Sequence, residues 1–500
     1  MAEPAAAPDG IDPRSGFCAA TRIFHSVRSS SAGSLPPESL PVTATAYAFS
    51  LLACPLPDRP ALVDAATGIA VSYPYFLAAV RSLASGLWST LGLRPGDVAL
   101  VVAPSRLEIP VLHFALMSIG AVVSPANPAS TPEEYAHQVA LSRPVVAFAA
   151  PEVAAKVPGN VRCVVLGSDA YRRLSSAGAE AAPPQVAVKQ SDTASVLYSS
   201  GTTGRVKAVA ITHRNLIALV CTHAENRKRV AAEAIEAGQE PPPPAVTLLP
   251  LPLFHVFGFM MVLRSVSMGD TTVLMERFDF GAALRAIERY RVTLLPAAPP
   301  VLVAMIKSEE ARRHDISSLL VIAVGGAPLG REVAERFVAV FPNVQIVQGR
   351  RSPWPYGDKN PNTKTVDSEG WLKTGDLCYF NEDGFLYIVD RLKELIKYKG
   401  YQVPPAELEH TLQSHPGIAD AAVIGYPDED AGQLPMAFIV RQPGFNLTGQ
   451  QVMDYVAKHV VPYKKVRRMA FVNAIPKSPA GKILRRELVQ QALSMGASKL

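Results

Sequence analysis

The sequence predicts an α/β protein, with a large amino-terminal α/β domain and a smaller carboxy-terminal α+β domain. The chain has 500 residues, which is too many for one hydrophobic core. Hydrophobic residues make up 48% of it and charged residues 18%, the balance of a globular protein. Short β-branched runs alternate with longer helical segments, a pattern typical of parallel sheets covered by helices.

The predicted elements divide the chain into three parts. Residues 1–40 are rich in Ala, Ser and Pro and lack periodicity, so we expect a loosely ordered lead-in. The large domain is expected over residues 41–390, and a smaller pattern restarts after Asp390 over residues 391–500. Strands are predicted at 98–102, 121–125, 145–149, 163–166, 246–249, 272–275, 292–295, 320–324, 421–425 and 437–441, helices at 108–119 and 449–459, and a loop at the prolines 241–244.

Charge, cysteine usage and hydropathy exclude several classes of protein. The net charge of +6 over 500 residues is a weak bias, and we expect no nucleic-acid partner. The five cysteines have neither metal-ligand nor redox spacing, so no metal ligand is assigned and buried thiols are expected. The most apolar stretch, residues 111–123, is interrupted by His113 and Ser118 and is too short to span a bilayer.

The last three residues, Ser498, Lys499 and Leu500, form a Ser-Lys-Leu terminus. A tripeptide of this kind with a free carboxylate is the peroxisomal address that an import receptor reads. The sequence therefore predicts a peroxisomal protein, with the import receptor as a partner.

The segment YSSGTTGRVK at 198–207 follows a strand-like run. Glycines let backbone N–H groups approach phosphates closely, and Lys207 adds a positive charge. A flexible loop without a ligand is the alternative interpretation, and the spacing is not that of a Walker A loop. Thr212 is placed to cap the helix that follows. The candidate phosphate-binding residues are Ser199, Ser200, Gly201, Thr202, Thr203, Gly204 and Lys207.

This segment resembles the phosphate-loop signature of the acyl-adenylate-forming, or AMP-binding, superfamily. Within that superfamily, the segment DRLKELIKYKG at 390–400, which resembles the inter-domain hinge, and HVFG at 255–258 are most similar to plant 4-coumarate–CoA ligases and their peroxisomal relatives. The further segments that carry the resemblance are LPLFHVFG at 251–258, MERF at 275–278, GGAPLG at 325–330, GWLKTGD at 370–376, DRLKELIKYKG at 390–400 and PKSPAGK at 476–482.

The resemblance implies an adenylate-forming fold, in which the small domain is mobile and rotates about Asp390, and a set of ligand contacts. From the residues alone, Asp376 is part of a turn. Three lysines, Lys393, Lys397 and Lys399, form a solvated basic face. His255 is a core histidine with its hydrogen bonds made. The resemblance implies that His255 is a gate to the acyl pocket. It implies ATP contacts from the phosphate loop, Asp376, Arg391 and Lys482, acyl-AMP or substrate contacts from His255, Phe257, Ala327, Gln348, Gly349, Lys393 and Lys397, and coenzyme A contacts from Arg277, Lys399 and Gly400.

Lys482 is the residue predicted to carry catalysis. Adenylation brings a carboxylate to the α-phosphate of ATP, so two anions must meet, and a lysine that bridges them offsets the repulsion. The alternative for an isolated lysine is a surface position. Mg²⁺ is expected with ATP, because phosphoryl chemistry normally needs its charge.

The sequence departs from the family pattern after Gly349. The family continues with a Tyr-Gly-x-Thr-Glu segment, whereas this chain reads RRSPWPYGD at 350–358. The missing stretch supplies a Thr and a Glu for ATP and Mg²⁺, and strands of a small β-subdomain. We therefore expect exposed apolar surface beside the gap near 349–356. An exon-skipped product or a gene-model error is the hypothesis for this junction.

The resemblance implies an ATP-dependent carboxylic acid–CoA ligase that forms an acyl-AMP and then a thioester. The acid is a hydroxycinnamate or a fatty, oxylipin-type acid, and a peroxisomal address favours the second. A homologue that binds nucleotide without turnover is the alternative from another class. A luciferase-like oxygenase is a third, which light emission with luciferin, ATP and oxygen would reveal.

Overall fold

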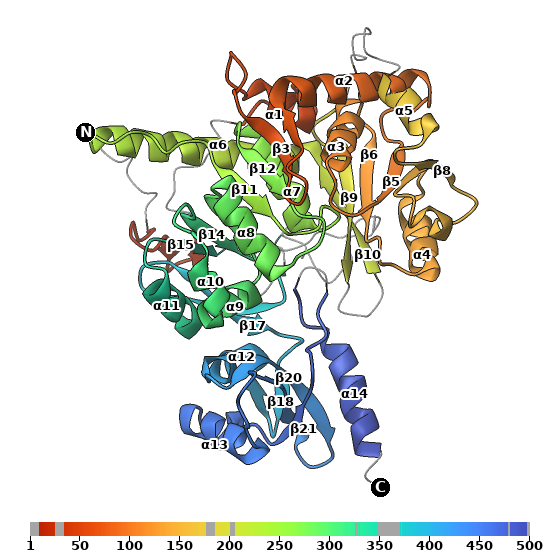
Figure 1. Cartoon of the computed structure of the whole chain (residues 1–500). Coiled ribbons are helices and arrows are strands. Elements are labelled where there is room, and N and C mark those ends of the chain that lie inside the picture. The colour runs from red at the N-terminus through yellow and green to blue at the C-terminus, as the bar shows by residue number, and fades with distance from the viewer. Residues whose placement is uncertain are drawn as a thin grey trace.

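The computed structural model describes residues 10–25, 35–176, 186–200, 206–325, 329, 331–348, 371, 373–478 and 481–497. At seven of these positions it describes the backbone alone, namely 199, 200, 206, 331, 332, 496 and 497. Two sheets and their helices form the large upper body in Figure 1, and a smaller domain lies below it. The α/β class and the large and small domains predicted from the sequence are confirmed.

The first sheet has six strands and is parallel except for its edge strand β10. Its central strand, VALVV, is buried along its whole length, as expected where helices cover both faces. In spatial order the strands are β10 (Val206–Thr212), β9 (Thr193–Ser200), β6 (Val122–Ala126), β5 (Val98–Val102), β7 (Val146–Ala149) and β8 (Arg162–Val165).

The second sheet has seven strands and is parallel except for its edge strand β4. Strand β15 forms the other edge, and nearly half of the Val347 side chain is exposed there. In spatial order the strands are β15 (Gln345–Gln348), β14 (Val321–Val324), β13 (Leu294–Ala297), β11 (Val246–Leu249), β12 (Thr271–Leu274), β3 (Pro60–Asp64) and β4 (Ala70–Ser72).

One apolar core joins the two sheets, because side chains of both pack on the same central helices. Phe76 of α2 and Phe114 of α3 are fully buried in it and meet edge to face. The helices of the large domain are α1 (Ala44–Ser50), α2 (Tyr73–Ser89), α3 (Glu108–Ser118), α4 (Pro132–Ser142), α5 (Asp169–Ser176), α6 (His213–Glu236), α7 (Val256–Ser267), α8 (Phe280–Tyr290), α9 (Pro299–Lys307), α10 (Glu309–Arg313) and α11 (Arg331–Val340).

The small domain has a five-stranded sheet and three helices. Its long hairpin β20–β21 carries apolar side chains on both faces, and two clusters of buried residues form its core. The elements are β18 (Ile396–Tyr398), β19 (Tyr401–Val403), α12 (Pro405–Ser414), β20 (Ile418–Asp428), β21 (Gly432–Arg441), α13 (Gly449–His459), β22 (Arg468–Phe471) and α14 (Arg485–Ala497).

A separate two-stranded hairpin, β16 (Asp376–Phe380) and β17 (Leu386–Arg391), leads into the small domain. Much of its apolar surface is open to solvent, with Phe385 64% and Tyr379 55% exposed. This is the exposed apolar surface that the sequence predicts beside the departure from the family pattern. Among the described residues the hairpin has no further partner strand, and a single hairpin cannot bury both of its faces.

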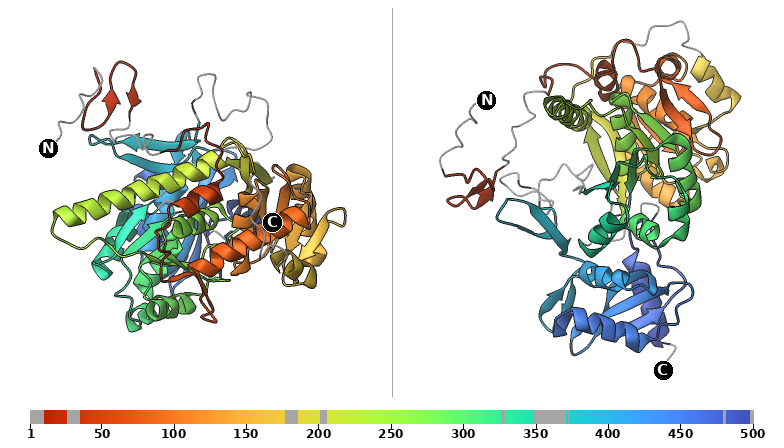
Figure 2. Two further views of the ribbon diagram at one scale, coloured as in Figure 1. Left: turned by 90° about the horizontal axis from the view of Figure 1, so that it is seen from above. Right: turned by 60° about the vertical axis from the view of Figure 1, so that its left-hand side comes forward.

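Residues 10–25, within the expected loosely ordered lead-in, form a second hairpin, β1 (Phe17–Cys18) and β2 (Ile23–Phe24). It lies beside β16–β17, as Figure 2 shows. The ring of Phe24 stacks on that of Phe380 with 3.9 Å between centroids, and Arg14 pairs with Asp383. Hydrophobic contact with the other hairpin thus orders a segment that has no periodicity of its own.

The predicted strand at 292–295 begins two residues too early. Helix α8 ends at Tyr290, and Arg291 adopts a left-handed conformation with φ of 51°. The N–H of Val292 then donates to the carbonyl of Ile287, so Val292 still belongs to the helix end. A β-branched run cannot reveal this, because the same residues suit a strand. The predicted helix at 449–459 and the loop at 241–244 are confirmed.

Candidate active site

The carboxyl ends of three neighbouring parallel strands, β13, β14 and β15, lie level with one another. Ala297 of β13 pairs with Val324 of β14, and Val324 pairs with Gln348 of β15. Ligands of open α/β sheets bind in the crevice beyond such strand ends. The predicted substrate residue Gln348 lies at this carboxyl edge of the sheet, and it is exposed. Gly349 and Ala327 lie outside the described residues.

The segment after β11 reaches the same edge. His255 is half-buried and caps helix α7, where its Nδ1 accepts a hydrogen bond of 3.3 Å from the N–H of Phe257. The ring of Phe257 lies against Gly325, and a Cβ at that glycine would come within 2.8 Å of it. Two segments predicted to line the acyl pocket therefore meet here. His255 is a helix cap rather than a core histidine.

The predicted phosphate loop connects two antiparallel strands, β9 and β10. Lys207 is exposed and pairs in register with Ser199, directly beside the loop. The predicted cap at Thr212 is confirmed: its side chain accepts from the N–H of Asn215, whose amide side chain in turn accepts from the N–H of Thr212. The loop residues Gly201, Thr202, Thr203 and Gly204 and the side chains of Ser199 and Ser200 lie outside what the structure describes.

Asp376 and Arg391, both predicted to bind ATP, face each other across the β16–β17 hairpin as register partners. The N–H of Asp376 donates to the Oγ1 of Thr374 at 3.2 Å, which orders the turn before the strand. The structure thus brings together two residues that are 15 positions apart, at the point where the chain enters the small domain.

The buried carboxylate of Asp390 organises the predicted hinge. It accepts hydrogen bonds from the N–H of Arg391 at 2.7 Å and from the N–H of Ala406 at 3.1 Å. Burial raises the pKa of Asp390, and these two backbone donors oppose the rise. The carboxylate therefore ties the end of β17 to the start of α12.

Lys482 sits in a tight loop that closes on itself. The N–H of Lys482 donates to the Oγ of Ser478 at 3.1 Å, and its carbonyl accepts from the N–H of Ser478 at 2.8 Å. The loop reaches the large domain at Ala298, directly after β13. A Cβ at Gly481 would come within 2.9 Å of the Cβ of Ala298. The predicted catalytic lysine is therefore delivered to the carboxyl edge of the second sheet.

The surroundings of Lys482 suit an anion. Burial lowers the pKa of Lys482, the nearby cation Arg391 lowers it further, and the carboxylate of Glu394 opposes the change at 4.0 Å. Two cations held together in a partly buried place favour a negatively charged ligand between them. A polyphosphate or an acyl phosphate has that charge.

The sequence does not reveal the acidic and basic groups that hold this lysine in place. Arg485 binds the buried Glu409 through two hydrogen bonds of 2.7 and 2.8 Å and pairs with Glu394 at 3.1 Å. Glu409 also accepts from the N–H of Val423 at 2.8 Å. The one signal in the sequence is the position of Arg485 just after the PKSPAGK motif, because Glu409 lies in an ordinary helical pattern.

The predicted coenzyme A residues lie on both domains. Arg277 is exposed after β12, whereas Lys399 and Gly400 form the turn between β18 and β19. Both turn residues have positive φ, 47° and 82°, and the space around Gly400 is open. Among the described residues, no hydrogen bond or ion pair joins Arg277 to this turn. The predicted acyl-AMP contacts Lys393 and Lys397 are exposed on the small-domain side.

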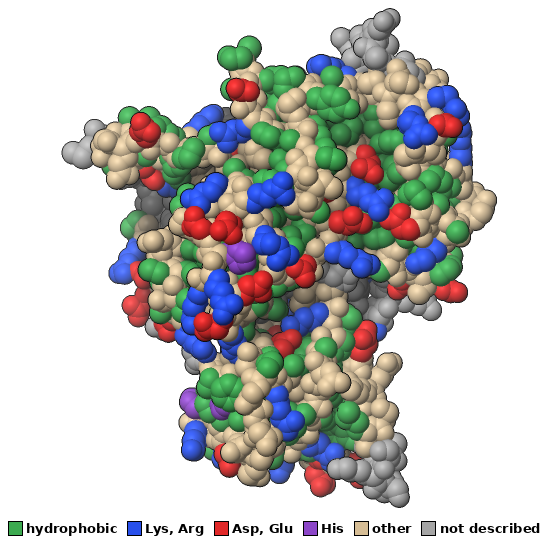
Figure 3. All heavy atoms as spheres, in the orientation of Figure 1, with side chains coloured by type: hydrophobic (Ala, Val, Ile, Leu, Met, Phe, Trp, Pro, Cys, Tyr) green, Lys and Arg blue, Asp and Glu red, His purple; other side chains and the backbone are tan. Residues whose placement is uncertain are grey.

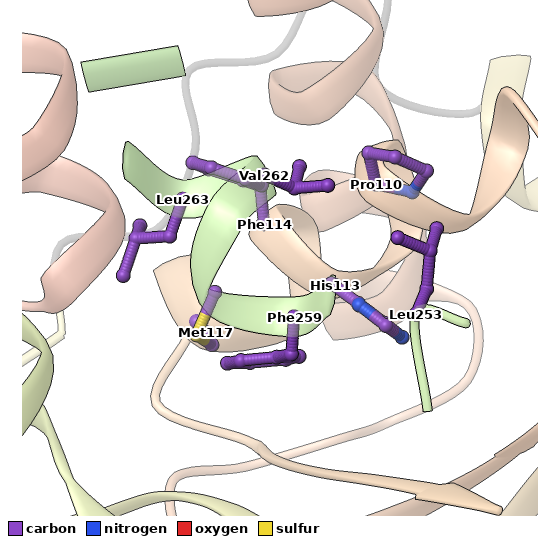
Figure 4. Close-up of a pocket in the computed structure, with 8 residues that line it drawn as sticks. All are labelled: Pro110, His113, Phe114, Met117, Leu253, Phe259, Val262 and Leu263. Carbon is purple, nitrogen blue, oxygen red and sulfur yellow. The ribbon is translucent and has the colours of Figure 1, made fainter. Parts of the chain in front are cut away.

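An internal cavity of about 10 Å³ lies between helices α3 and α7 (Figure 4). His113 points into it, and its buried Nε2 has no hydrogen-bond partner. Burial lowers the pKa of His113 to about 3, so the ring is neutral. A volume of this size fits at most one water molecule, so the cavity is too small for an acyl group.

The surface and the remaining side chains set further limits. On the face shown in Figure 3, basic and acidic side chains are interspersed over both domains. No helix in the described part of the chain is long and apolar enough to cross a bilayer. Over the same residues, no group of three or more His, Cys, Asp or Glu side chains is placed to hold a metal ion.

Comparison with known proteins links this geometry to a family. Residues 53–349 match the family described as AMP-binding enzyme, and residues 407–482 match the AMP-binding enzyme C-terminal domain. The first match ends at Gly349, where the sequence leaves the family pattern. A solved anthranilate CoA ligase in complex with anthranoyl-AMP shares the fold, with a TM-score of 0.78 and 22% identity over 94% of this chain and 100% of that chain.

Plant sequences show the same relationship. The rice protein "4-coumarate–CoA ligase-like 5" is 77% identical over 98% of both chains, and the Arabidopsis thaliana protein "4-coumarate–CoA ligase-like 9" is 46% identical over the same shares. The rice alignment spans 531 positions, more than the 500 residues of this chain, so part of that relative has no counterpart here. The chain belongs to the AMP-binding enzyme family and is a ligase of the acyl-CoA ligase type, with 4-coumarate–CoA ligase-like proteins among its relatives.

Proposed function

We propose that this chain is an ATP-dependent carboxylic acid–CoA ligase that works in two half-reactions. In the first, a carboxylate oxygen attacks the α-phosphorus of ATP, and the bond to the pyrophosphate oxygen breaks. In the second, the sulfur of coenzyme A attacks the acyl carbon of the acyl-AMP. AMP leaves with its phosphate oxygen, and the thiol proton passes to solvent.

The observation that carries this proposal is the position of the Lys482 loop. The loop contacts Ala298 at the carboxyl edge of the second sheet, with Arg391 close enough to lower the pKa of Lys482. Lys482 would bridge the carboxylate and the α-phosphate, and Asp376, opposite Arg391, would hold the ribose hydroxyls. Phe257 at Gly325 would form a wall of the acyl pocket.

Mg²⁺ enters the proposal with ATP, where it would neutralise phosphate charge. The described residues offer no cluster of acidic side chains to hold it. We infer that Lys207, Arg391 and Lys482 of this chain would share the phosphate charge with it.

For the acid, we propose a hydroxycinnamate or a fatty, oxylipin-type acid. The names of the rice and Arabidopsis relatives support the first class. The Ser-Lys-Leu terminus supports the second, since peroxisomes degrade fatty chains. A homologue that binds nucleotide without turnover is the second candidate, and the departure after Gly349 favours it.

The test is acid-dependent ATP–pyrophosphate exchange by the purified chain, with hydroxycinnamic, fatty and cyclopentanone acids as substrates. Exchange that a Lys482→Ala variant loses supports the ligase, and the best acid identifies the substrate class. If the folded protein shows no exchange with any acid but still binds ATP, the non-catalytic homologue replaces the ligase.

We also propose a peroxisomal location, on the basis of Ser498, Lys499 and Leu500, which lie outside the described residues. A fluorescent protein fused in front of the full chain should accumulate in peroxisomes. The same fusion with Leu500→Glu should stay in the cytosol, and an identical distribution of both would contradict the address.

A further inference from the structure

Helix α9 touches the small domain at both of its ends. It has nine residues, which makes it about 13 Å long, and it starts directly after strand β13. Its amino-terminal cap is Ala298, the residue against which Gly481 of the Lys482 loop lies. Its last residue is Lys307. Both contacts therefore come from the same rigid element of the large domain.

At the carboxyl end of α9, two cations bind the small domain between the end of helix α12 and the start of strand β20. The Nζ of Lys307 donates to the carbonyls of Gln413, at 3.4 Å, and of Ile418. The Nη1 of Arg336, from the neighbouring helix α11, donates to the carbonyl of Ser414 at 2.9 Å. The last carbonyls of a helix lack partners within it and carry partial negative charge, so two cations suit this place.

Between the two contacts the interface is hollow. A cavity of about 400 Å³ separates the side of α9, with Pro300 and Val303, from Ala419 and Gln442 of the small domain. Lys307 and Asp420 line this cavity, and Asp420 pairs with Lys477 of the Lys482 loop at 2.5 Å. Because this cavity separates the middle of α9 from the small domain, the contacts at the two ends of the helix connect it to that domain.

We propose that Lys307 and Arg336 are positioning residues, which hold the end of α12 so that the Lys482 loop rests against Ala298. The Lys307 ammonium is partly buried, and burying a charge is unfavourable unless it gains hydrogen bonds. The carbonyls of Gln413 and Ile418 supply these hydrogen bonds, which fits a positioning role. The catalytic consequence rests on the proposed function: these residues favour the domain orientation in which the acid is adenylated, and they make no contact with the reacting atoms.

The first experiment measures the domain orientation directly and does not depend on activity. Spin labels are placed at Arg81→Cys of α2 and Lys458→Cys of α13, both exposed. Cys54, Cys163 and Cys378 are replaced by serine, because they are exposed and not buried as the sequence predicts. Pulsed electron paramagnetic resonance should give one narrow distance distribution in the parent chain. In Lys307→Met/Arg336→Met, a second distance should appear, with the ratio of the two populations changed roughly tenfold.

Two variants separate positioning from general damage. Lys307→Arg, made in the parent chain with Arg336 unchanged, keeps a cation at the end of α9 and should show the parent distance distribution. Arg313→Met removes an exposed cation of α10 and should leave the distribution unchanged. A parent-like distribution in the double methionine variant, with thermal melting confirming a folded protein, would overturn the proposal.

The second experiment measures each half-reaction. The double methionine variant should lose roughly tenfold in acid-dependent pyrophosphate exchange, while thioester formation from added acyl-AMP stays the same or rises. Equal losses in both half-reactions, with unchanged distances, would also overturn the positioning role. A parent chain without exchange would end the proposed function, whereas the spin-label distances would still decide this inference.

Discussion

The Nζ of Lys482 lies 4.0 Å from the carboxylate of Glu394, which also pairs with Arg485 at 3.1 Å. One carboxylate thus serves two cations of the same loop and helix. Glu394 therefore offsets only part of the positive charge of Lys482 and Arg391. The remaining positive charge can attract an anion, and substitution of either the lysine or the carboxylate tests this arrangement.

Removing the lysine should abolish most of the first half-reaction. Lys482→Ala should lower acid-dependent pyrophosphate exchange about 10²- to 10³-fold, because the charge that bridges the two anions is lost. ATP binding, measured by calorimetry, should weaken much less. The control is Lys458→Ala on the exposed face of α13, which should exchange like the parent. Equal activity of the two variants would remove Lys482 from the catalytic role.

Removing the carboxylate should move the alkaline limb of the pH profile. Glu394 raises the pKa of Lys482 against the lowering by burial and Arg391. In Glu394→Gln that pKa should fall further, so Lys482 loses its proton at a lower pH and exchange declines earlier as the pH rises. The pH dependence of the exchange rate measures this. A limb that stays in place or moves to higher pH would contradict the arrangement.

Breaking the buried ion pair should destabilise the small domain. Arg485→Leu leaves the carboxylate of Glu409 buried without its cation, at a cost of about 3–5 kcal/mol in the free energy of unfolding. In the parent chain burial raises the pKa of Glu409 to about 7, above its unfolded value of 4.5, although Arg485 lowers it, so the pKa should be higher still in the variant. The fold of this variant is therefore least affected below pH 4.5, and it loses stability as the pH rises toward and beyond 7.

Urea titrations of Arg485→Leu at pH 5 and pH 8 measure this difference. The matched control is Glu409→Leu/Arg485→Leu, which removes both charges and should recover part of the loss. Recovery stays incomplete because the N–H of Val423 loses its acceptor. A single variant that is equally stable at both pH values would show that the pKa of Glu409 is not raised in the folded variant.

The amino-terminal hairpin should stabilise the hairpin that carries Asp376. Phe24→Ala removes the ring stacked on Phe380. Amide hydrogen exchange in residues 376–391 should then become roughly two- to tenfold faster, as expected for the loss of one aromatic pair. Phe385→Ala is the control, because that ring is 64% exposed. Unchanged exchange in Phe24→Ala would mean that the two hairpins are independent.

Most of the fold follows from patterns that the sequence displays. The run VALVV at 98–102 is buried on both faces, and its length and β-branched content identify a central parallel strand. The hairpin of residues 10–25 could not be predicted in this way. Its two strands have two residues each, and its order comes from contact with Phe380, far away in the sequence.

Some residues of the candidate site could likewise be predicted from the sequence, and others could not. The motifs identify Lys482, Arg391 and Asp376, and the structure places Asp376 opposite Arg391 and the Lys482 loop against Ala298. Ala298 and Glu394 could not be found from the sequence, since an alanine and a charged residue among lysines carry no signal. Their roles depend on which elements meet in space, and only the topology of the sheet and the small domain decides that.

The carboxylate of Asp390 has a consequence for any movement of the small domain. One of its hydrogen bonds goes to the strand that holds Arg391 opposite Asp376, and the other goes to Ala406 at the first turn of α12. A turn of the small domain about this residue cannot keep both sides fixed. Either the link to Ala406 breaks and Arg391 stays with Asp376, or Arg391 travels with the small domain and the ladder opens at its last pair. If this pair binds the nucleotide as proposed, the first route would keep that contact assembled through the whole catalytic cycle, and the second would release AMP as the domain turns.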